Sequence, residues 1–290
     1  MPDVDDAERL FRIGRGNWDA FDLPIDRIYE AAETWRAAIG GIQNPWLCWN
    51  VQPDWSFVQQ RLVAGVGWTP IVGFDPRVGP PSTVSEAVIV DFNERLQLPV
   101  LYPHFVLEFA FLFAERLAFW HSDLLLTETD MASFASSFLM LKDGEMAAVR
   151  SPSGWRRWLP SRHHRYWELL GCTTKGASQS QFDRGCGWWM HFSRHPNAAN
   201  AGSGSKHWEY GCGIRHWQSS HKGIVHDISE DQIKYGHFSR IGMSDYKPSA
   251  TNNVFRDLNK DLQENVSLVD CVSSLDIAHL LPAEPIRQGA

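Results

Sequence analysis

Residues 46–74 read WLCWNVQPDWSFVQQRLVAGVGWTPIVGF and decide the fold. Two short apolar runs in this stretch, Trp46–Val51 and Thr69–Phe74, are bounded by turn residues and are typical of strands. The segment between them, Ser56–Val66, has the pattern of a helix. A further apolar run at Ala87–Phe92 predicts another strand. This alternation indicates an α/β fold with a central, mostly parallel sheet.

The chain before this stretch predicts a helix. Apolar residues recur there at three- and four-residue spacing until Gly40 and Gly41 end the pattern; they are Ile25, Ile28, Ala32, Trp35 and Ile39. This spacing places the apolar side chains on one helix face. We therefore expect an amphipathic helix that packs on the rest of the protein.

The chain after residue 100 continues the alternation. Phe105–Leu117 is apolar nearly all round and predicts a buried helix against the sheet. Leu117–Leu126 predicts a buried strand that ends at a site, and Met146–Val149 predicts a strand that returns to the sheet. Asp130 is a candidate cap for the helix between these two strands.

Beyond residue 150 the regular pattern fades into sequence rich in Gly, Trp and His. The whole chain holds 14 Trp and 12 His. A buried indole needs a hydrogen-bond partner for its N–H, so this abundance favours partly exposed rings whose free face could contact a ligand. Core packing explains many of the rings equally well. We predict an N-terminal helical segment at 1–44, an α/β half at 45–150 and an irregular half at 151–290 that closes the site.

The composition excludes several classes of protein. With 27 Lys and Arg against 34 Asp and Glu, the formal charge is −7, and no nucleic-acid partner is predicted. No apolar stretch approaches the roughly 20 residues that cross a bilayer, and the acidic start is unlike a secretion signal. Five cysteines without a C-x-x-C pair argue against a disulfide framework. We expect a cytoplasmic protein with reduced thiols.

The sharpest candidate site is His121-Ser122-Asp123, at the end of a predicted strand. The carboxyl end of a sheet strand faces the crevice in which ligands of open α/β sheets bind. A carboxylate there suits Mg²⁺ or Mn²⁺, and imidazole is compatible with Mn²⁺. His121 and Asp123, two residues apart at the end of the strand, could both reach one metal only if a turn or bulge overrides the alternation of the strand. The alternative is that Asp123 caps a following turn.

The order of elements in residues 45–150 resembles that of GT-A-type glycosyltransferases, which hold a metal through a D-x-D motif. His121-Ser122-Asp123 occupies the place of that motif, with the first Asp replaced. The resemblance implies a GT-A/Rossmann-like sheet, a nucleotide-sugar donor and Mn²⁺ or Mg²⁺ as cofactor. It further implies that Asp75 and Arg77 hold the nucleotide, and that His237 completes the metal shell.

A second segment, Gln179 to Trp189, suggests an acceptor side. Adjacent tryptophans in extended chain point to opposite faces, so one of Trp188 and Trp189 could pack in the core while the other stacks on a sugar. In the enzymes that the sequence resembles, an acidic residue of such a segment lies over the acceptor. Asp183 or Glu209 is therefore the candidate general base toward the acceptor hydroxyl.

Two other functions stay open at this point. The histidines late in the chain could serve as metal ligands of a metal-dependent hydrolase or oxygenase; among them are His216, His221, His226 and His237. Their spacing matches no recognised zinc pattern. The tryptophans could alternatively form the stacking platform of a carbohydrate-binding or assembly protein without enzymatic activity. Oligomeric state is not predicted.

Overall fold

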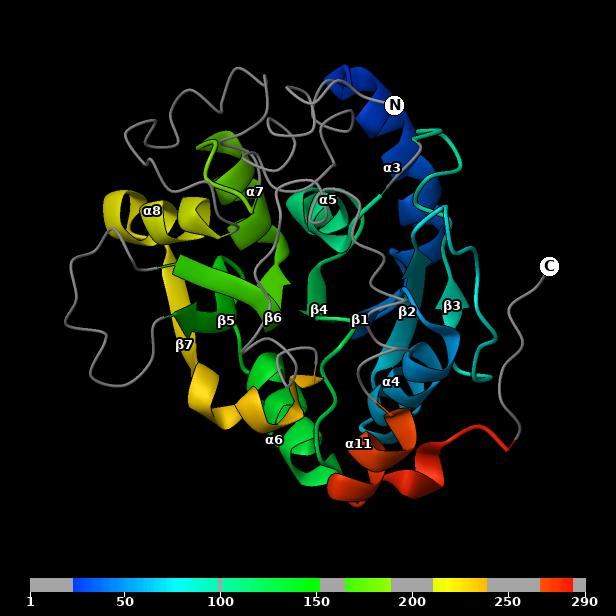
Figure 1. The fold of residues 1–290 in the computed structure, drawn as a ribbon. Coiled ribbons are helices and arrows are strands. Elements are labelled where there is room, and N and C mark those ends of the chain that lie inside the picture. The colour runs from blue at the N-terminus through cyan, green and yellow to red at the C-terminus, as the bar shows by residue number, and fades with distance from the viewer. Residues whose placement is uncertain (1–22, 99–100, 152–164, 189–210, 239–266, 284–290) are drawn as a thin grey trace, which may run out of the picture.

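The computed structural model describes residues 23–98, 101–151, 165–188, 211–238 and 267–283 (Figure 1). Its strands are β1 Pro45–Asn50, β2 Thr69–Phe74, β3 Val88–Ile89, β4 Arg116–Trp120, β5 Glu145–Ser151, β6 Arg165–Thr174 and β7 Ile224–Ser229. Its α-helices are α3 Ile25–Ile39, α4 Pro53–Gly65, α5 Pro103–Glu108, α6 Glu128–Leu139, α7 Lys175–Asp183, α8 Cys212–His221 and α11 Leu268–Ser274. Short 3-10 helices lie at η1 Ala110–Leu112, η6 Glu230–Gln232, η7 Lys234–Gly236 and η10 Ala278–Leu280.

The described strands form one seven-stranded sheet in the order β3-β2-β1-β4-β6-β5-β7. Neighbouring pairs are parallel except those made by β6, which is antiparallel to both β4 and β5. The sheet is thus mostly parallel, as expected. From β1 the chain passes to β2 on one side, whereas β4 pairs with β1 on the other side. The order of strands therefore reverses between β1 and β4, which is where open α/β sheets bind ligands.

Helices cover both sides of the sheet (Figure 1). Helices α4, α6 and α11 lie on one side, and α3, α5, α7 and α8 lie on the other. Every residue of β1 is buried, as a central parallel strand covered on both faces requires. Trp46 packs on Trp120 and on Phe138 of α6, with ring centroids 5.4 Å apart in each pair.

Most tryptophans in the part of the chain that the structure describes are core residues. Trp35, Trp46, Trp49, Trp55 and Trp188 are among the largest fully buried side chains. Trp35 of α3 lies with its ring centroid 5.4 Å from Phe92, in the turn that follows β3. Packing between helices and sheet therefore accounts for these five rings, and the interpretation as ligand-facing surfaces fails for them.

Several sequence expectations are confirmed and others need correction. The predicted helix up to Ile39 and the strand Thr69–Phe74 have the expected bounds. The expected long helix at Phe105–Leu117 is only α5 followed by η1, because the chain enters β4 at Arg116. Thr127, rather than Asp130, caps α6: its side chain accepts a hydrogen bond from the backbone N–H of Asp130.

The sheet does not stop at residue 150. Strands β6 and β7 come from the part of the chain that was expected to be irregular, and β6 lies between β4 and β5. Gly171 of β6 permits this pairing, since a Cβ there would lie 2.4 Å from the carbonyl oxygen of Ala147 and 2.5 Å from the ring of Phe119. Among the described residues, no helix has the length and apolar character that crossing a membrane requires.

Candidate metal centre

A turn follows β4 and brings His121 and Asp123 together. The backbone N–H of His121 still bonds to the Leu169 carbonyl of β6 at 2.9 Å, and the N–H of Leu124 then bonds back to the His121 carbonyl at 3.1 Å. The turn lets His121 Nδ1 hydrogen-bond directly to Asp123 Oδ1. The sequence required a turn after the strand for His121 and Asp123 to reach one metal, and the structure has this turn.

The turn is held from α4 by a buried glutamine. Gln59 Nε2 donates to the carbonyl oxygens of His121 and Leu124, both at 2.9 Å. Gln59 itself is fully buried. These bonds satisfy two carbonyls that the sheet cannot satisfy, so a side chain of α4 fixes the shape of the site.

His237 reaches the same carboxylate from a distant part of the chain. The segment after η7 is tied to the turn by backbone bonds from Leu125 N to Gly236 O at 3.0 Å and from Phe238 N to Asp123 O at 3.2 Å. His237 Nε2 lies 3.1 Å from Asp123 Oδ1. A ligand atom from each of His121, Asp123 and His237 lies within 4.8 Å of the other two. The structure thus brings together all three residues that were predicted to hold a metal.

The electrostatics of the cluster keep Asp123 ionised. Its side chain is 3% exposed, and its Oδ2 has no hydrogen-bond partner among the described residues. Burial alone would raise the pKa of Asp123, but the imidazoles of His121 and His237 lower it well below its ordinary value. A buried carboxylate oxygen without a donor is costly unless a cation or water meets it. One carboxylate and two imidazoles form a donor set that fits a divalent cation such as Mn²⁺.

A second buried ion pair lies beside His121, and the sequence analysis missed it. His104 Nε2 of α5 is 2.7 Å from Glu168 Oε1 of β6. Burial would raise the pKa of Glu168, but His104 and, to a smaller extent, His121 bring it down to about 2. The only signal in the sequence was a polar residue within an apolar run at each of the two positions. An apolar run with one polar residue does not reveal which distant polar residue will be its partner in the folded protein.

Asp75 and Arg77, the residues predicted to hold the nucleotide, follow β2, and Asn50, which was not predicted, ends the neighbouring strand β1. Asp75, directly after β2, is buried and accepts two hydrogen bonds from the Arg77 side chain, from Nε to Oδ1 at 2.7 Å and from Nη2 to Oδ2 at 2.9 Å. Asn50, the last residue of β1, is fully buried and donates to the Gly79 carbonyl. Its Oδ1 has no hydrogen-bond partner among the described residues. These polar groups lie at the same carboxyl edge of the parallel strands as Asp123.

Of the four residues predicted for the acceptor side, the structure describes Asp183 and Trp188. Asp183 lies on the exposed side of α7, accepts a hydrogen bond from Gln179 at 2.9 Å and lines a shallow pocket of about 430 Å³. Trp188 is 1% exposed and packs edge-on against Phe119 with ring centroids 5.5 Å apart, which is the position of a core residue. Its ring therefore offers no face to a sugar. Glu209 and Trp189 lie outside the described residues.

The late histidines divide among three places. His237 joins Asp123, whereas His226 lies with its Nε2 3.0 Å from Glu145 Oε2. His216 and His221 lie beside Cys186. Within the described part of the chain they do not form one histidine cluster, so the geometry does not favour a three-histidine oxygenase or hydrolase.

No protein-family model matches this sequence, and comparison with curated proteins and with solved structures finds no significant similarity. The fold and the site themselves define the class. The chain is an α/β protein with a mostly parallel sheet and a buried His-Asp-His cluster at the carboxyl end of a central strand.

Proposed function

We propose that this protein is a glycosyltransferase that moves a sugar from a nucleoside-diphosphate donor to a hydroxyl acceptor. The observation that carries the proposal is the convergence of His121, Asp123 and His237 directly after β4, beside the point where the strand order reverses. A mostly parallel sheet with one antiparallel strand among those described is compatible with the GT-A-type arrangement that the sequence resembles.

Asp123, His121 and His237 would hold the metal. Two imidazoles in the set favour Mn²⁺ over Mg²⁺, which prefers oxygen ligands and retains several waters. A cation bound there would offset the negative charge that a nucleoside diphosphate carries as leaving group. Asp123 is ready for this role because its neighbours keep it ionised and one of its oxygens has no hydrogen-bond partner among the described residues.

The nucleotide side would be formed by the ends of β1 and β2. The bidentate Asp75–Arg77 pair fixes the loop after β2, and Arg77 keeps 41% of its side chain exposed. An exposed guanidinium beside the site can bind phosphate oxygens, because its N–H groups match their geometry. Asn50 adds a buried acceptor oxygen with no described donor, which suits a hydroxyl or amide of the donor nucleotide.

The acceptor side depends on Asp183 or Glu209 as general base and on Trp189 as the stacking ring. Glu168 is nearer to the metal residues, but with a pKa of about 2 it is a weak base at neutral pH. Glu168 instead supports the imidazoles of His104 and His121 with its negative charge. Trp188, being in the core, is no part of this proposal.

A thermal-shift screen against UDP, GDP and CMP, each with and without Mn²⁺, tests the proposal. A nucleotide that binds the folded state raises the melting temperature by an amount that grows with the logarithm of its concentration relative to its Kd. We expect a nucleoside diphosphate to raise it only when Mn²⁺ is present. Sugar binding without any nucleotide effect would reject the transferase and favour a carbohydrate-binding protein. Stoichiometric retention of a transition metal at His237 through purification would favour a metal-dependent hydrolase or oxygenase.

A further inference from the structure

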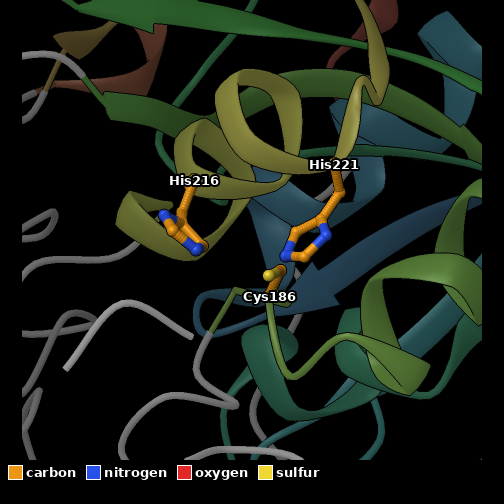
Figure 2. A group of neighbouring side chains, drawn as sticks. All are labelled: Cys186, His216 and His221. Carbon is orange, nitrogen blue, oxygen red and sulfur yellow. The ribbon is translucent and has the colours of Figure 1, made fainter. Parts of the chain in front are cut away.

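A second set of metal-ligand side chains lies apart from the His121-Asp123-His237 cluster. Cys186, His216 and His221 each offer one ligand atom, and these three atoms lie within 4.8 Å of one another. Figure 2 shows the imidazoles of His216 and His221 extending from α8 toward the side on which the Cys186 sulfur lies. The two rings have centroids 5.6 Å apart and are nearly perpendicular.

Two features of the backbone place Cys186 against α8: the turn after α7 and the close approach of Gly213. After α7, Gly185 adopts a left-handed conformation with φ 64°, and the N–H of Cys186 bonds to the Gln181 carbonyl at 2.9 Å. In the first turn of α8, Gly213 lies so close that a Cβ there would be 2.3 Å from the carbonyl oxygen of Gly187. A side chain at residue 213 would push α8 away from the sulfur.

The donor atoms of His221 and Cys186 are available for a ligand, and His216 Nδ1 contacts Ser220 Oγ at 3.3 Å. His221 Nε2 is buried and has no hydrogen-bond partner among the described residues. Cys186 is buried, is not in a disulfide, and has a weak contact from Sγ to the Arg184 carbonyl at 3.2 Å. A buried nitrogen without a partner normally costs stability, so its presence beside a sulfur and a second imidazole points to a ligand.

We propose that Cys186, His216 and His221 bind a Zn²⁺ ion that fastens α8 to the turn after α7. One sulfur and two imidazole nitrogens form a set that suits Zn²⁺ and is foreign to Mg²⁺ and Ca²⁺. With three ligands from the described residues, the fourth tetrahedral position is left for a further ligand or water. The ion would reinforce the hydrogen bond from Trp217 Nε1 to Ser180 Oγ, 3.1 Å long, which already joins the two helices.

Cobalt substitution tests this site on the full chain. Metal-stripped protein titrated with Co²⁺ is expected to show a thiolate-to-cobalt absorption band and tetrahedral visible bands that saturate at one equivalent. Cys186→Ser removes the thiolate band, and His221→Gln weakens Co²⁺ binding at this site at least about 100-fold, since even loss of an outer-shell partner costs about 10–100-fold. Cys271→Ser, at a buried cysteine of α11, serves as the matched control and keeps the band.

Two further measurements separate binding at Cys186 from binding at Asp123 and from misfolding of a variant. Asp123→Asn must leave the thiolate band intact, because its site contains no sulfur; failure of the transferase proposal therefore does not affect this one. X-ray absorption of the zinc-loaded wild type does not depend on any variant folding, and we expect one Zn–S distance of about 2.3 Å and Zn–N distances of about 2.0–2.1 Å. Zinc bound without sulfur, or a cobalt band that persists in folded Cys186→Ser, would overturn the site.

Discussion

His237 Nε2 lies 3.1 Å from Asp123 Oδ1, although the two residues belong to distant parts of the sequence. The contact depends on the backbone pairing of the segment after η7 with the turn after β4. Because His121 approaches the same oxygen, one buried carboxylate is shared by two imidazoles. This arrangement is the basis of the proposed metal site, and it can be tested by changing the backbone as well as the ligands.

Gly236 should be required for that backbone pairing. A Cβ at this position would lie 1.8 Å from the Leu125 carbonyl oxygen, so Gly236→Ala must displace the segment that carries His237. We expect the Kd for Mn²⁺ to rise at least about 10-fold, as for loss of an outer-shell support, when Mn²⁺ binding is measured by electron paramagnetic resonance. Gly65→Ala is the matched control because a Cβ there meets no atom within 4 Å; unchanged binding in Gly236→Ala would contradict this view.

Replacing Gln59 should damage the same site from α4. Gln59→Leu keeps the approximate volume but removes the side-chain donor from both carbonyls, and it leaves the Leu124 carbonyl without a donor among the described residues because only the His121 carbonyl still accepts the backbone N–H of Leu124. We expect the free energy of unfolding to fall by about 1–3 kcal/mol, as for buried groups left unsatisfied, together with weaker Mn²⁺ binding. Urea unfolding and Mn²⁺ titration of the same samples measure both effects. A variant with wild-type Mn²⁺ affinity would show that the turn keeps its shape without Gln59.

The His104–Glu168 pair predicts a dependence of stability on acid pH. The pKa of Glu168 is about 2 in the folded protein against 4.5 for the ordinary group, so the carboxylate stabilises the fold fully above about pH 4.5. This contribution, of the order of 1–3 kcal/mol, is lost as the pH falls from about 4.5 to about 2. Urea unfolding between pH 6 and pH 3 should show a smaller fall in stability for Glu168→Gln than for the wild type. Parallel pH profiles would refute the pairing.

Trp188 should matter for stability and not for ligand binding. Its ring is buried against Phe119, so Trp188→Ala is expected to lower the free energy of unfolding by about 3–5 kcal/mol. Trp188→Phe, which retains most of the packing, should lose less. Comparing the melting temperatures of the two variants shows which substitution lowers the stability more. Near-wild-type stability of Trp188→Ala would place the ring outside the core and return it to the acceptor side.

The sequence predicted the first part of the fold because its signals are local. The periodicity up to Ile39 and the βαβ pattern of residues 46–74 depend on neighbouring residues, and β1, α4 and β2 form there. Strand β6 escaped prediction because its partners are far away in the sequence: Gly171 lies opposite Phe119 of β4 and Ala148 of β5. A glycine in an aromatic-rich run resembles a loop until those neighbours are known.

The metal-site residues likewise divide into those with a local signal in the sequence and those without one. His121 and Asp123 could be predicted because a polar break at the end of an apolar strand is visible in the sequence. His237 was assigned to the same metal site only through the resemblance to GT-A-type enzymes. The partnership of His104 with Glu168 could not be predicted, since it joins α5 to β6 across the fold. The grouping of Cys186 with His216 and His221 likewise depends on how α8 packs against the turn after α7.

The most direct test of the central claim compares Asp123→Asn with Asp231→Asn, a change at an exposed carboxylate of η6 that pairs with Lys234. Calorimetric titration with the nucleoside diphosphate selected by the screen, in saturating Mn²⁺, measures the role of each carboxylate. We expect Asp123→Asn to keep its fold and a melting temperature close to that of the wild type but to lose Mn²⁺-dependent nucleotide binding, while Asp231→Asn binds as the wild type does. Wild-type Mn²⁺-dependent binding by a folded Asp123→Asn protein would contradict this expectation.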